Sequence, residues 1–191
     1  SAVAGYADKI SDMLENPFSY GYSTVLLVSE SQLGQVTGFS LLLVFPNIRS
    51  GLLDFMAVRR DIRGAGTGTI LYDATREYAR QHNLLGIKLE GLTDDPAVAQ
   101  DAAVLQENRQ RLRFYESYGI RPVIGTEYET PIGNTPAPYL LFDGLDRPQP
   151  LRRSECRAAV RTILSKKYSH LVKADYIERV VESIVDDPVR F

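Results

Sequence analysis

The chain has 191 residues, of which 44% are hydrophobic and 24% charged, and its formal net charge at pH 7 is −2. These values are typical of a globular protein with a buried core, and they argue against a general nucleic-acid-binding protein, which usually carries a basic excess. One cysteine excludes an intrachain disulfide, and two histidines leave little material for a histidine-rich metal site. The sequence has no apolar run of the ~20 residues that a membrane span needs and no signal-peptide pattern, so we expect a soluble cytoplasmic protein.

The first 45 residues predict one helix followed by a β-hairpin. Residues 1–20 carry apolar side chains at helical spacing up to Pro17, before which the helix should end. Strands are predicted over residues 24–28 and 36–44, with a turn between them. The longest apolar run, residues 41–45, is assigned to the core.

A glycine-rich turn between a strand and a helix is the strongest local signal. The strand is predicted over residues 52–58, the helix runs to about residue 81, and the turn reads Arg63-Gly64-Ala65-Gly66-Thr67-Gly68. Because the first N–H groups of a helix lack partners within it and the helix dipole adds positive charge there, this arrangement predicts an anion site, and we expect a diphosphate. A Walker loop would need a lysine here, and a dinucleotide-binding turn would need a third glycine at Thr69.

The second half of the chain predicts shorter elements and a helical end. Strands are expected over residues 87–90, 123–129 and 139–142, and Asp95–Pro96 has the pattern of a helix start. Two prolines in residues 146–150 indicate a linker. Two amphipathic helices follow, with stripes that run from Ala159 to Leu164 and from Ile177 to Val185. Asp175 and Glu178 resemble a capping box, and Cys156 is expected to be a buried structural thiol.

A second motif lies downstream of the glycine-rich turn. Asn108 is followed seven residues later by Tyr115 and then by the turn Tyr118-Gly119-Ile120. Together with the Arg-x-x-Gly-x-Gly turn five residues after Val58, this motif resembles the GNAT acetyltransferase family over roughly residues 20–145. Arg111 replaces the alanine that is usual in the family, and Ile120 replaces the usual phenylalanine.

The resemblance implies a mixed α+β fold with a central, twisted, mostly antiparallel sheet that splays between its fourth and fifth strands and is flanked by helices. It divides the chain into an acetyl-CoA-binding domain at residues 1–145, without the family's first strand, a linker at 146–150 and a helical extension at 151–191. The family core does not need this C-terminal helical pair. We expect the pair to pack on the domain, to form a homodimer, or to link to an attached domain.

The resemblance also implies roles for individual residues. Acetyl-CoA would be the cosubstrate, with no metal. The main chain near Ala57 and Val58 would pair with its pantetheine arm, the N–H groups of residues 63–68 would bind its pyrophosphate, and Asn108 would bond the arm. Tyr115 matches the position that protonates the departing thiolate in many members, and a core aromatic is the alternative. Asp54 is the candidate base, with Glu90 and a water chain as rivals.

The implied reaction is transfer of an acetyl group to a primary amine by direct attack in a ternary complex. The sequence does not decide between a small amine, a polyamine, an aminoglycoside and a protein lysine, and it predicts neither a nucleic-acid nor a membrane partner. Residues 91–107 contain Asp94, Asp95, Asp101 and Glu107 and form either a solvated excursion or a lid near a cationic acceptor. Two other functions stay open: an acetyl-CoA sensor without turnover, and a pure interaction module.

Overall fold

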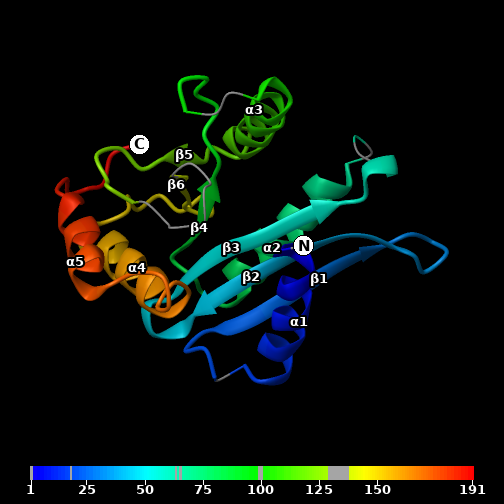
Figure 1. Ribbon diagram of the computed structural model, residues 1–191, viewed down its shortest axis with the longest axis horizontal. Coiled ribbons are helices and arrows are strands. Elements are labelled where there is room, and N and C mark those ends of the chain that lie inside the picture. Colours follow the sequence, from blue (N-terminus) through cyan, green and yellow to red (C-terminus); the bar gives the residue numbers. More distant parts are fainter. Residues whose placement is uncertain (1, 18, 63, 65, 99–100, 129–137) are drawn as a thin grey trace. The chain divides into compact units, whose positions relative to one another are not determined.

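The computed structural model describes residues 2–17, 19–62, 64, 66–98, 101–128 and 138–191 (Figure 1). The described residues form five α-helices and six strands, and the strand pairs β1–β2, β2–β3 and β5–β6 are antiparallel. The predicted mixed α+β class with mostly antiparallel strands is therefore confirmed. The chain divides into two compact parts, residues 1–87 and residues 88–191.

The first part contains an antiparallel sheet with the strand order β1-β2-β3. Helix α2 packs on all three strands and α1 packs against β1 (Figure 1). The elements are α1 (Ala2–Glu15), β1 (Ser23–Glu30), β2 (Val36–Phe45), β3 (Ser50–Val58) and α2 (Thr67–Gln81). The predicted helix end before Pro17, the hairpin, the third strand and the following helix are confirmed.

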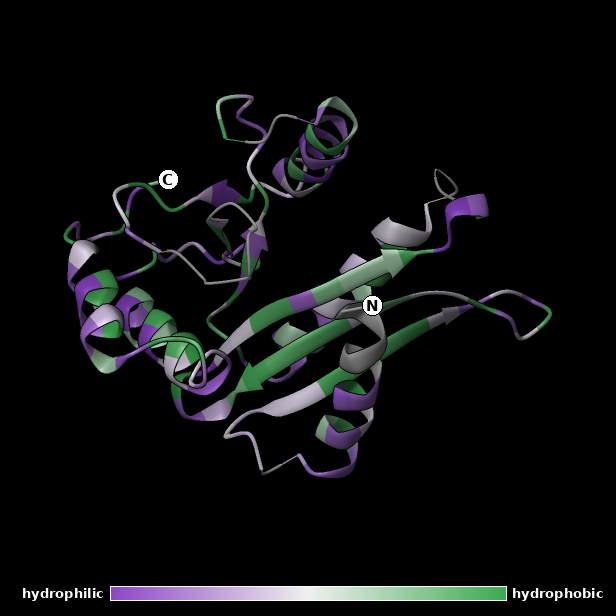
Figure 2. Ribbon diagram, in the orientation of Figure 1, coloured by the Kyte–Doolittle hydropathy of each residue, from purple (hydrophilic) through white to green (hydrophobic). Residues whose placement is uncertain are grey.

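Strand β2 is the centre of this part, with one face against α2 and the other against Tyr22, which in turn contacts α1. The hydroxyl groups of Ser40 on β2 and Thr75 on α2 are 2.6 Å apart and share a hydrogen bond. On the opposite face, the ring of Phe45 meets the ring of Tyr22 edge-on at 5.6 Å, and the Tyr22 hydroxyl lies 3.4 Å from the Met13 sulfur of α1. All residues of the predicted core run 41–45 are buried, and the strand is hydrophobic along this length (Figure 2).

The second part contains the remaining strands and the C-terminal helical pair. In its sheet, β6 lies between β4 and β5. The elements are β4 (Gly86–Gly91), α3 (Ala102–Glu116), β5 (Arg121–Pro122), β6 (Tyr139–Asp143), α4 (Arg153–Lys166) and α5 (Ala174–Ser183). Strands β4 and β6 and the two C-terminal helices were predicted from the sequence pattern.

The helix predicted to begin at Asp95–Pro96 is wrong. Asp95 instead forms a turn, in which its Oδ1 accepts a hydrogen bond from the Ala97 amide at 2.8 Å and its carbonyl accepts one from the Val98 amide at 3.1 Å. Helix α3 begins only after Asp101, whose Oδ1 accepts hydrogen bonds from the amides of Ala103 and Val104. Both aspartates have N-cap chemistry, and only the second is followed by a helix.

The strand predicted over residues 123–129 is also wrong for the residues that the structure describes. Strand β5 ends at Pro122, and Gly125 has a left-handed backbone with φ +76°. The Ile124 amide donates to the Arg190 carbonyl at 3.0 Å, and the Glu127 amide donates to the Ser183 hydroxyl at 2.8 Å. The C-terminal segment therefore takes up backbone groups that a sheet ladder would otherwise use.

The C-terminal helical pair packs as an amphipathic hairpin. Its predicted apolar stripes are buried apart from Val185, which lies beyond the end of α5, and Cys156 is fully buried as expected. The predicted capping box is absent because the N-cap of α5 is Lys173 and Asp175 lies inside the first turn. Glu178 instead accepts two hydrogen bonds from Arg161 of α4, at 2.9 and 2.6 Å. Residues beyond α5 return to β6, where Phe191 stacks on Phe142 at 5.7 Å. The pair thus packs within the second part, while the domain boundary at 146–150 stays a prediction.

Candidate functional site

The glycine-rich turn leads directly into a helix whose N-cap residue, Gly66, offers no side chain to cap its first amides. Gly66 is the N-cap of α2, and the Ile70 amide makes the first helical hydrogen bond, to the Gly66 carbonyl at 3.1 Å. The amides of Thr67, Gly68 and Thr69 precede that bond, and Gly66 has no side chain with which to cap them. These N–H groups and the helix dipole form the kind of site that binds a phosphate. Arg63 and Ala65, which were also predicted to bind the pyrophosphate, lie outside the described residues.

Backbone conformation explains two of the glycines. Gly64 and Gly66 have φ values of +91° and +83°, in the left-handed region that other residues rarely adopt. A Cβ atom at either position would meet no atom within 4 Å, so packing does not require glycine there. Gly68 differs, because it lies inside α2, where a Cβ would be 3.9 Å from Val58 Cγ2. The turn therefore needs glycine for its path, and this path exposes the amides of the α2 N-terminus.

The two predicted main-chain ligands on β3 point in different directions. The Arg59 amide donates to the Thr37 carbonyl at 2.9 Å, directly after the pair Gly38–Val58 in the β2–β3 register. Alternation in an antiparallel ladder then directs the main-chain groups of Ala57 toward β2 and those of Val58 away from it. Of the two residues, Val58 is the better placed to offer an amide to a ligand.

Asp54 lies in a β-bulge. Leu41 of β2 pairs with Phe55 and Leu42 pairs with Leu53, so Asp54 is the additional residue between them. From Asp54 onward the exposure of β3 alternates, and Asp54, Met56 and Val58 are all half-buried, as the predicted strand parity requires. The Asp54 side chain is half-buried. Bulges are frequent beside active sites, and the role of Asp54 as a base stays a prediction.

Asn108 of α3 fixes the segment that follows β4. Its side chain is buried, with 4% of the residue exposed, and Nδ2 donates to the Thr93 carbonyl at 2.8 Å. The Thr93 hydroxyl lies 3.1 Å from the Tyr139 hydroxyl of β6 and also accepts a hydrogen bond from the Asp95 amide. The sequence motif singled out Asn108, but Thr93 and Tyr139 carry no local signal.

Tyr115 lies near the end of α3 and is 7% exposed. Its ring meets the ring of Phe114 edge-on at 5.5 Å. Burial raises the pKa of Tyr115 to about 12, and the nearby Arg111 opposes this only in part. The phenol is therefore fully protonated at neutral pH and can donate a hydrogen bond. A free phenol has a pKa near that of a thiol, about 8.5, and burial moves the pKa of Tyr115 further from the thiol value.

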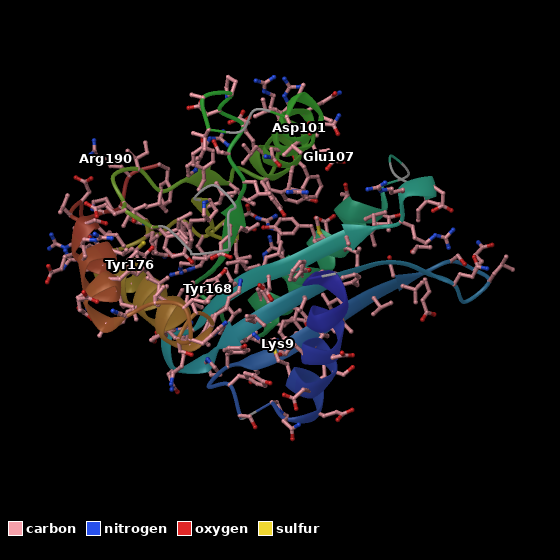
Figure 3. All side chains as sticks on the ribbon, viewed as in Figure 1. Lys9, Asp101, Glu107, Tyr168, Tyr176 and Arg190 are labelled. Carbon is pink, nitrogen blue, oxygen red and sulfur yellow. The ribbon has the colours of Figure 1, made fainter. Side chains whose placement is uncertain are left out.

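Glu90 is the centre of a buried polar cluster, the Glu90 cluster, formed with Tyr128, Lys167 and Tyr168. Its Oε1 accepts a hydrogen bond from the Tyr128 hydroxyl at 2.7 Å, and its Oε2 accepts from the Tyr168 hydroxyl at 2.7 Å and from Lys167 Nζ at 3.1 Å. The side chains of Glu90 and Lys167 are each 11% exposed. Tyr168 follows the last turn of α4 (Figure 3).

The contacts of Glu90 argue against its use as a general base. Burial, together with the neighbouring carboxylate, raises the pKa of Tyr128 and of Tyr168, so both phenols stay protonated and keep donating. Both oxygens of the Glu90 carboxylate already accept hydrogen bonds from the cluster, so neither is left free to contact a substrate. The sequence could not indicate this cluster because its members come from distant segments.

Lys88 is a second buried charge on β4. It is 2% exposed, and its Nζ lies 4.6 Å from the centre of the Phe142 ring. Burial lowers the pKa of Lys88 to about 8, partly opposed by Cys156 and Glu155. Burial also raises the pKa of the Cys156 thiol. Sequence reasoning missed Lys88 because it stands in a short apolar strand.

Two kinds of feature are absent among the described residues. No group of three or more histidine, cysteine, aspartate or glutamate side chains among them is arranged to hold a metal ion. No helix within the described ranges is both long enough and apolar enough to span a bilayer.

Comparison with known proteins gives a family and a fold. Residues 4–120 match the acetyltransferase (GNAT) family model, and no curated protein sequence matches the chain. An aminoglycoside 6′-N-acetyltransferase complexed with coenzyme A is 17% identical, with a TM-score of 0.53 over 72% of this chain and 79% of that one. A GNAT-family acetyltransferase from Staphylococcus aureus Mu50 is also 17% identical, with a TM-score of 0.50 over 73% and 79%. A tandem GNAT protein from the clavulanic acid biosynthesis pathway is 21% identical, with a TM-score of 0.48 over 56% of this chain, which spans 30% of that protein.

Proposed function

The chain belongs to the GNAT acetyltransferase family, and we propose that it transfers the acetyl group of acetyl-CoA to a primary amine. The observation that carries the proposal is the left-handed path through Gly64 and Gly66, which leads from β3 to the uncapped amides of α2 within the segment that matches the family. This path offers several N–H donors and a helix dipole to a diphosphate.

The coenzyme would be held by main-chain and side-chain donors. In the proposal, the amides of residues 63–68 bind the pyrophosphate, and the Val58 amide, which points away from β2, faces the acetyl oxygen and stabilises the oxyanion that develops there. Asn108 contacts the pantetheine arm, and its hydrogen bond to Thr93 fixes the orientation of its amide.

The proposed chemistry is direct attack without an acyl-enzyme. The neutral amine attacks the thioester carbonyl, a C–N bond forms, the C–S bond breaks, and the sulfur leaves as a thiolate that takes the hydroxyl proton of Tyr115. Water then returns a proton to the tyrosinate. The proton that the amine loses passes to Asp54 or to water. An acyl-enzyme on cysteine is disfavoured because Cys156 is fully buried and burial raises the pKa of its thiol.

The acceptor is proposed to be a small amine or a protein lysine. Asp94, Asp95 and Asp101 precede α3 and would attract a cationic acceptor through a complementary potential. The acetyl-CoA sensor without turnover is the second candidate. The burial of Tyr115 favours that sensor in one respect, because a phenol with a pKa of about 12 is a weaker acid than an unperturbed tyrosine.

A matched pair of glycine variants tests the coenzyme site. Gly66 and Gly34 both have left-handed backbones, with φ +83° and +71°, and a Cβ at either position would lie in open space. Gly66→Asp and Gly34→Asp should therefore lower the melting temperature similarly. Acetyl-CoA at 100 times its Kd should stabilise the wild type by about 2.7 kcal/mol. It should do the same for Gly34→Asp and do little for Gly66→Asp, where the carboxylate repels the phosphates.

The outcomes separate the candidate functions. Coenzyme-dependent stabilisation followed by acetylation in a panel of amines supports the enzyme. Stabilisation without acetylation of any amine in the panel indicates the sensor. If acetyl-CoA leaves the melting temperature of the wild type unchanged, both the enzyme and the sensor are refuted. The interaction module is then the remaining candidate. If Gly66→Asp keeps the full coenzyme response, the assignment of the glycine-rich turn is wrong.

A further inference from the structure

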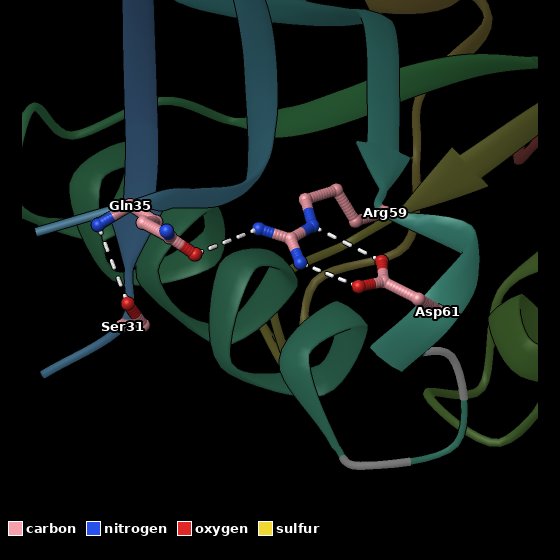
Figure 4. Close-up of polar contacts among 4 residues, drawn as sticks. All are labelled: Ser31, Gln35, Arg59 and Asp61. Carbon is pink, nitrogen blue, oxygen red and sulfur yellow. Dashed lines mark hydrogen bonds and ion pairs between the residues drawn. The ribbon is translucent and has the colours of Figure 1, made fainter. Parts of the chain in front are cut away.

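Arg59 links the short turn at residues 60–62, which precedes the glycine-rich turn, to the β1–β2 hairpin. Its guanidinium donates from Nε to Asp61 Oδ1 at 3.0 Å and from Nη2 to Asp61 Oδ2, and Nη1 donates to Gln35 Oε1 at 3.4 Å (Figure 4). The first two bonds form the planar two-point contact that arginine makes with a carboxylate and lysine cannot reproduce.

The residues at both ends of this link, Arg59 with Asp61 and Gln35, lie in turns that backbone hydrogen bonds hold. The Arg59 amide donates to the Thr37 carbonyl at 2.9 Å, and the Ile62 amide donates to the Arg59 carbonyl at 3.3 Å, which closes the short turn that contains Asp61. In the hairpin, the Ser31 amide donates to the Gln35 carbonyl at 2.8 Å, and the Gln35 amide donates to the Ser31 hydroxyl at 3.3 Å. The side-chain contacts therefore connect two ordered backbone turns.

The glycine-rich turn follows these contacts, and its conformation is costly to hold. Gly64 and Gly66 lose more conformational freedom on ordering than other residues would, so their path is costly to hold in one arrangement. Donors for a phosphate are useful only when they are held close to the bound geometry. We propose that Arg59, Asp61 and Gln35 form a positioning clamp that orders residues 59–62, which lead into the glycine-rich turn, and that the clamp thereby sets the affinity for the coenzyme diphosphate. The second half of this statement rests on the proposed function.

The competing explanation is that Arg59 binds a phosphate directly, and the two explanations differ in the sign of one effect. If Arg59 were a direct ligand, Asp61→Asn would release its guanidinium and remove a negative charge near an anion, so coenzyme A would bind more tightly. If Arg59 positions the turn, Asp61→Asn loosens it, so coenzyme A binds more weakly. The two-point contact between Arg59 and Asp61 is exposed to solvent. We therefore expect Asp61→Asn to lower the affinity for coenzyme A by about three- to fivefold.

The experiment measures the Kd of coenzyme A by calorimetry for the wild type, Asp61→Asn, Arg59→Lys and the double variant. Each single variant should weaken binding, and the double variant should lose no more affinity than the worse single one, since both changes break the same contact. Glu77→Gln is the control, because it removes a carboxylate from another exposed ion pair, with Arg80 on α2 at 3.8 Å. It should leave the Kd unchanged.

A second measurement needs no coenzyme. Hydrogen exchange of the amides of residues 59 and 62, which are hydrogen-bonded in the wild type, should be faster in Asp61→Asn and Arg59→Lys than in the wild type or in Glu77→Gln. Unchanged exchange, or tighter binding by Asp61→Asn, would overturn the clamp. Faster exchange in a protein whose wild type does not bind coenzyme A would support the ordering of the turn and overturn the proposed function instead.

Discussion

Lys88→Met should stabilise the protein at neutral pH. Lowering the pKa of Lys88 from 10.5 to about 8 corresponds to about 3 kcal/mol of free energy that the buried ammonium costs the folded state. Methionine has a similar length, no charge and a flexible chain that adapts to the same space. The contact of the ammonium with the Phe142 ring is lost, so we expect a net gain of about 1–3 kcal/mol.

The sign of the pH dependence makes the test specific. Between pH 8 and 10.5, Lys88 is protonated in the unfolded chain and mostly neutral in the folded chain. The free energy of unfolding of the wild type therefore rises with pH over this range. Lys88→Met lacks this rise. Its advantage over the wild type should therefore shrink by about 2 kcal/mol between pH 7 and pH 9.5.

Urea unfolding at these two pH values measures the difference, provided that the m-values agree. Lys166→Met is the control, because Lys166 is exposed at the end of α4 and its replacement should leave the free energy of unfolding nearly unchanged at both pH values. If Lys88→Met differs from the wild type by the same amount at pH 7 and pH 9.5, the ammonium is not under the electrostatic cost that its burial implies.

Three further changes test the site and the second part of the chain. Tyr115→Phe should keep coenzyme A affinity but lower the single-turnover rate by about 10²–10⁴-fold, and a loss below about threefold would exclude Tyr115 as the acid. The triple replacement of Asp94, Asp95 and Asp101 by asparagine preserves the hydrogen bonds that the side-chain oxygens accept. It should raise the acceptor KM more at low salt than at high salt. Equal changes in KM at both salt concentrations would argue against electrostatic attraction of the acceptor. Glu90→Gln should lower the free energy of unfolding by about 3 kcal/mol, because Lys167 stays charged in a buried place, and a loss below about 1 kcal/mol would contradict this.

The features that local pattern determines were predictable. The hairpin, the β3 strand and the glycine-rich start of α2 each follow from spacing and residue type over a short window, and the structure has all three. Family membership was also predictable, because the motifs around Gly66 and Asn108 are short, ordered and specific in residue type. The candidate coenzyme turn is local in the same sense, since a left-handed backbone needs glycine whatever surrounds it.

The tertiary structure decided what distant segments do to one another. The segment after β5 pairs with Ser183 and Arg190 instead of forming a strand, and Asp54 became the additional residue of a bulge. The Glu90 cluster and the Arg59 clamp join residues that no periodicity relates. Residue type and spacing determine which backbone conformations a segment prefers, but burial, pKa and the partner of each polar group depend on the neighbours that folding supplies, and those neighbours are set by packing across the whole chain.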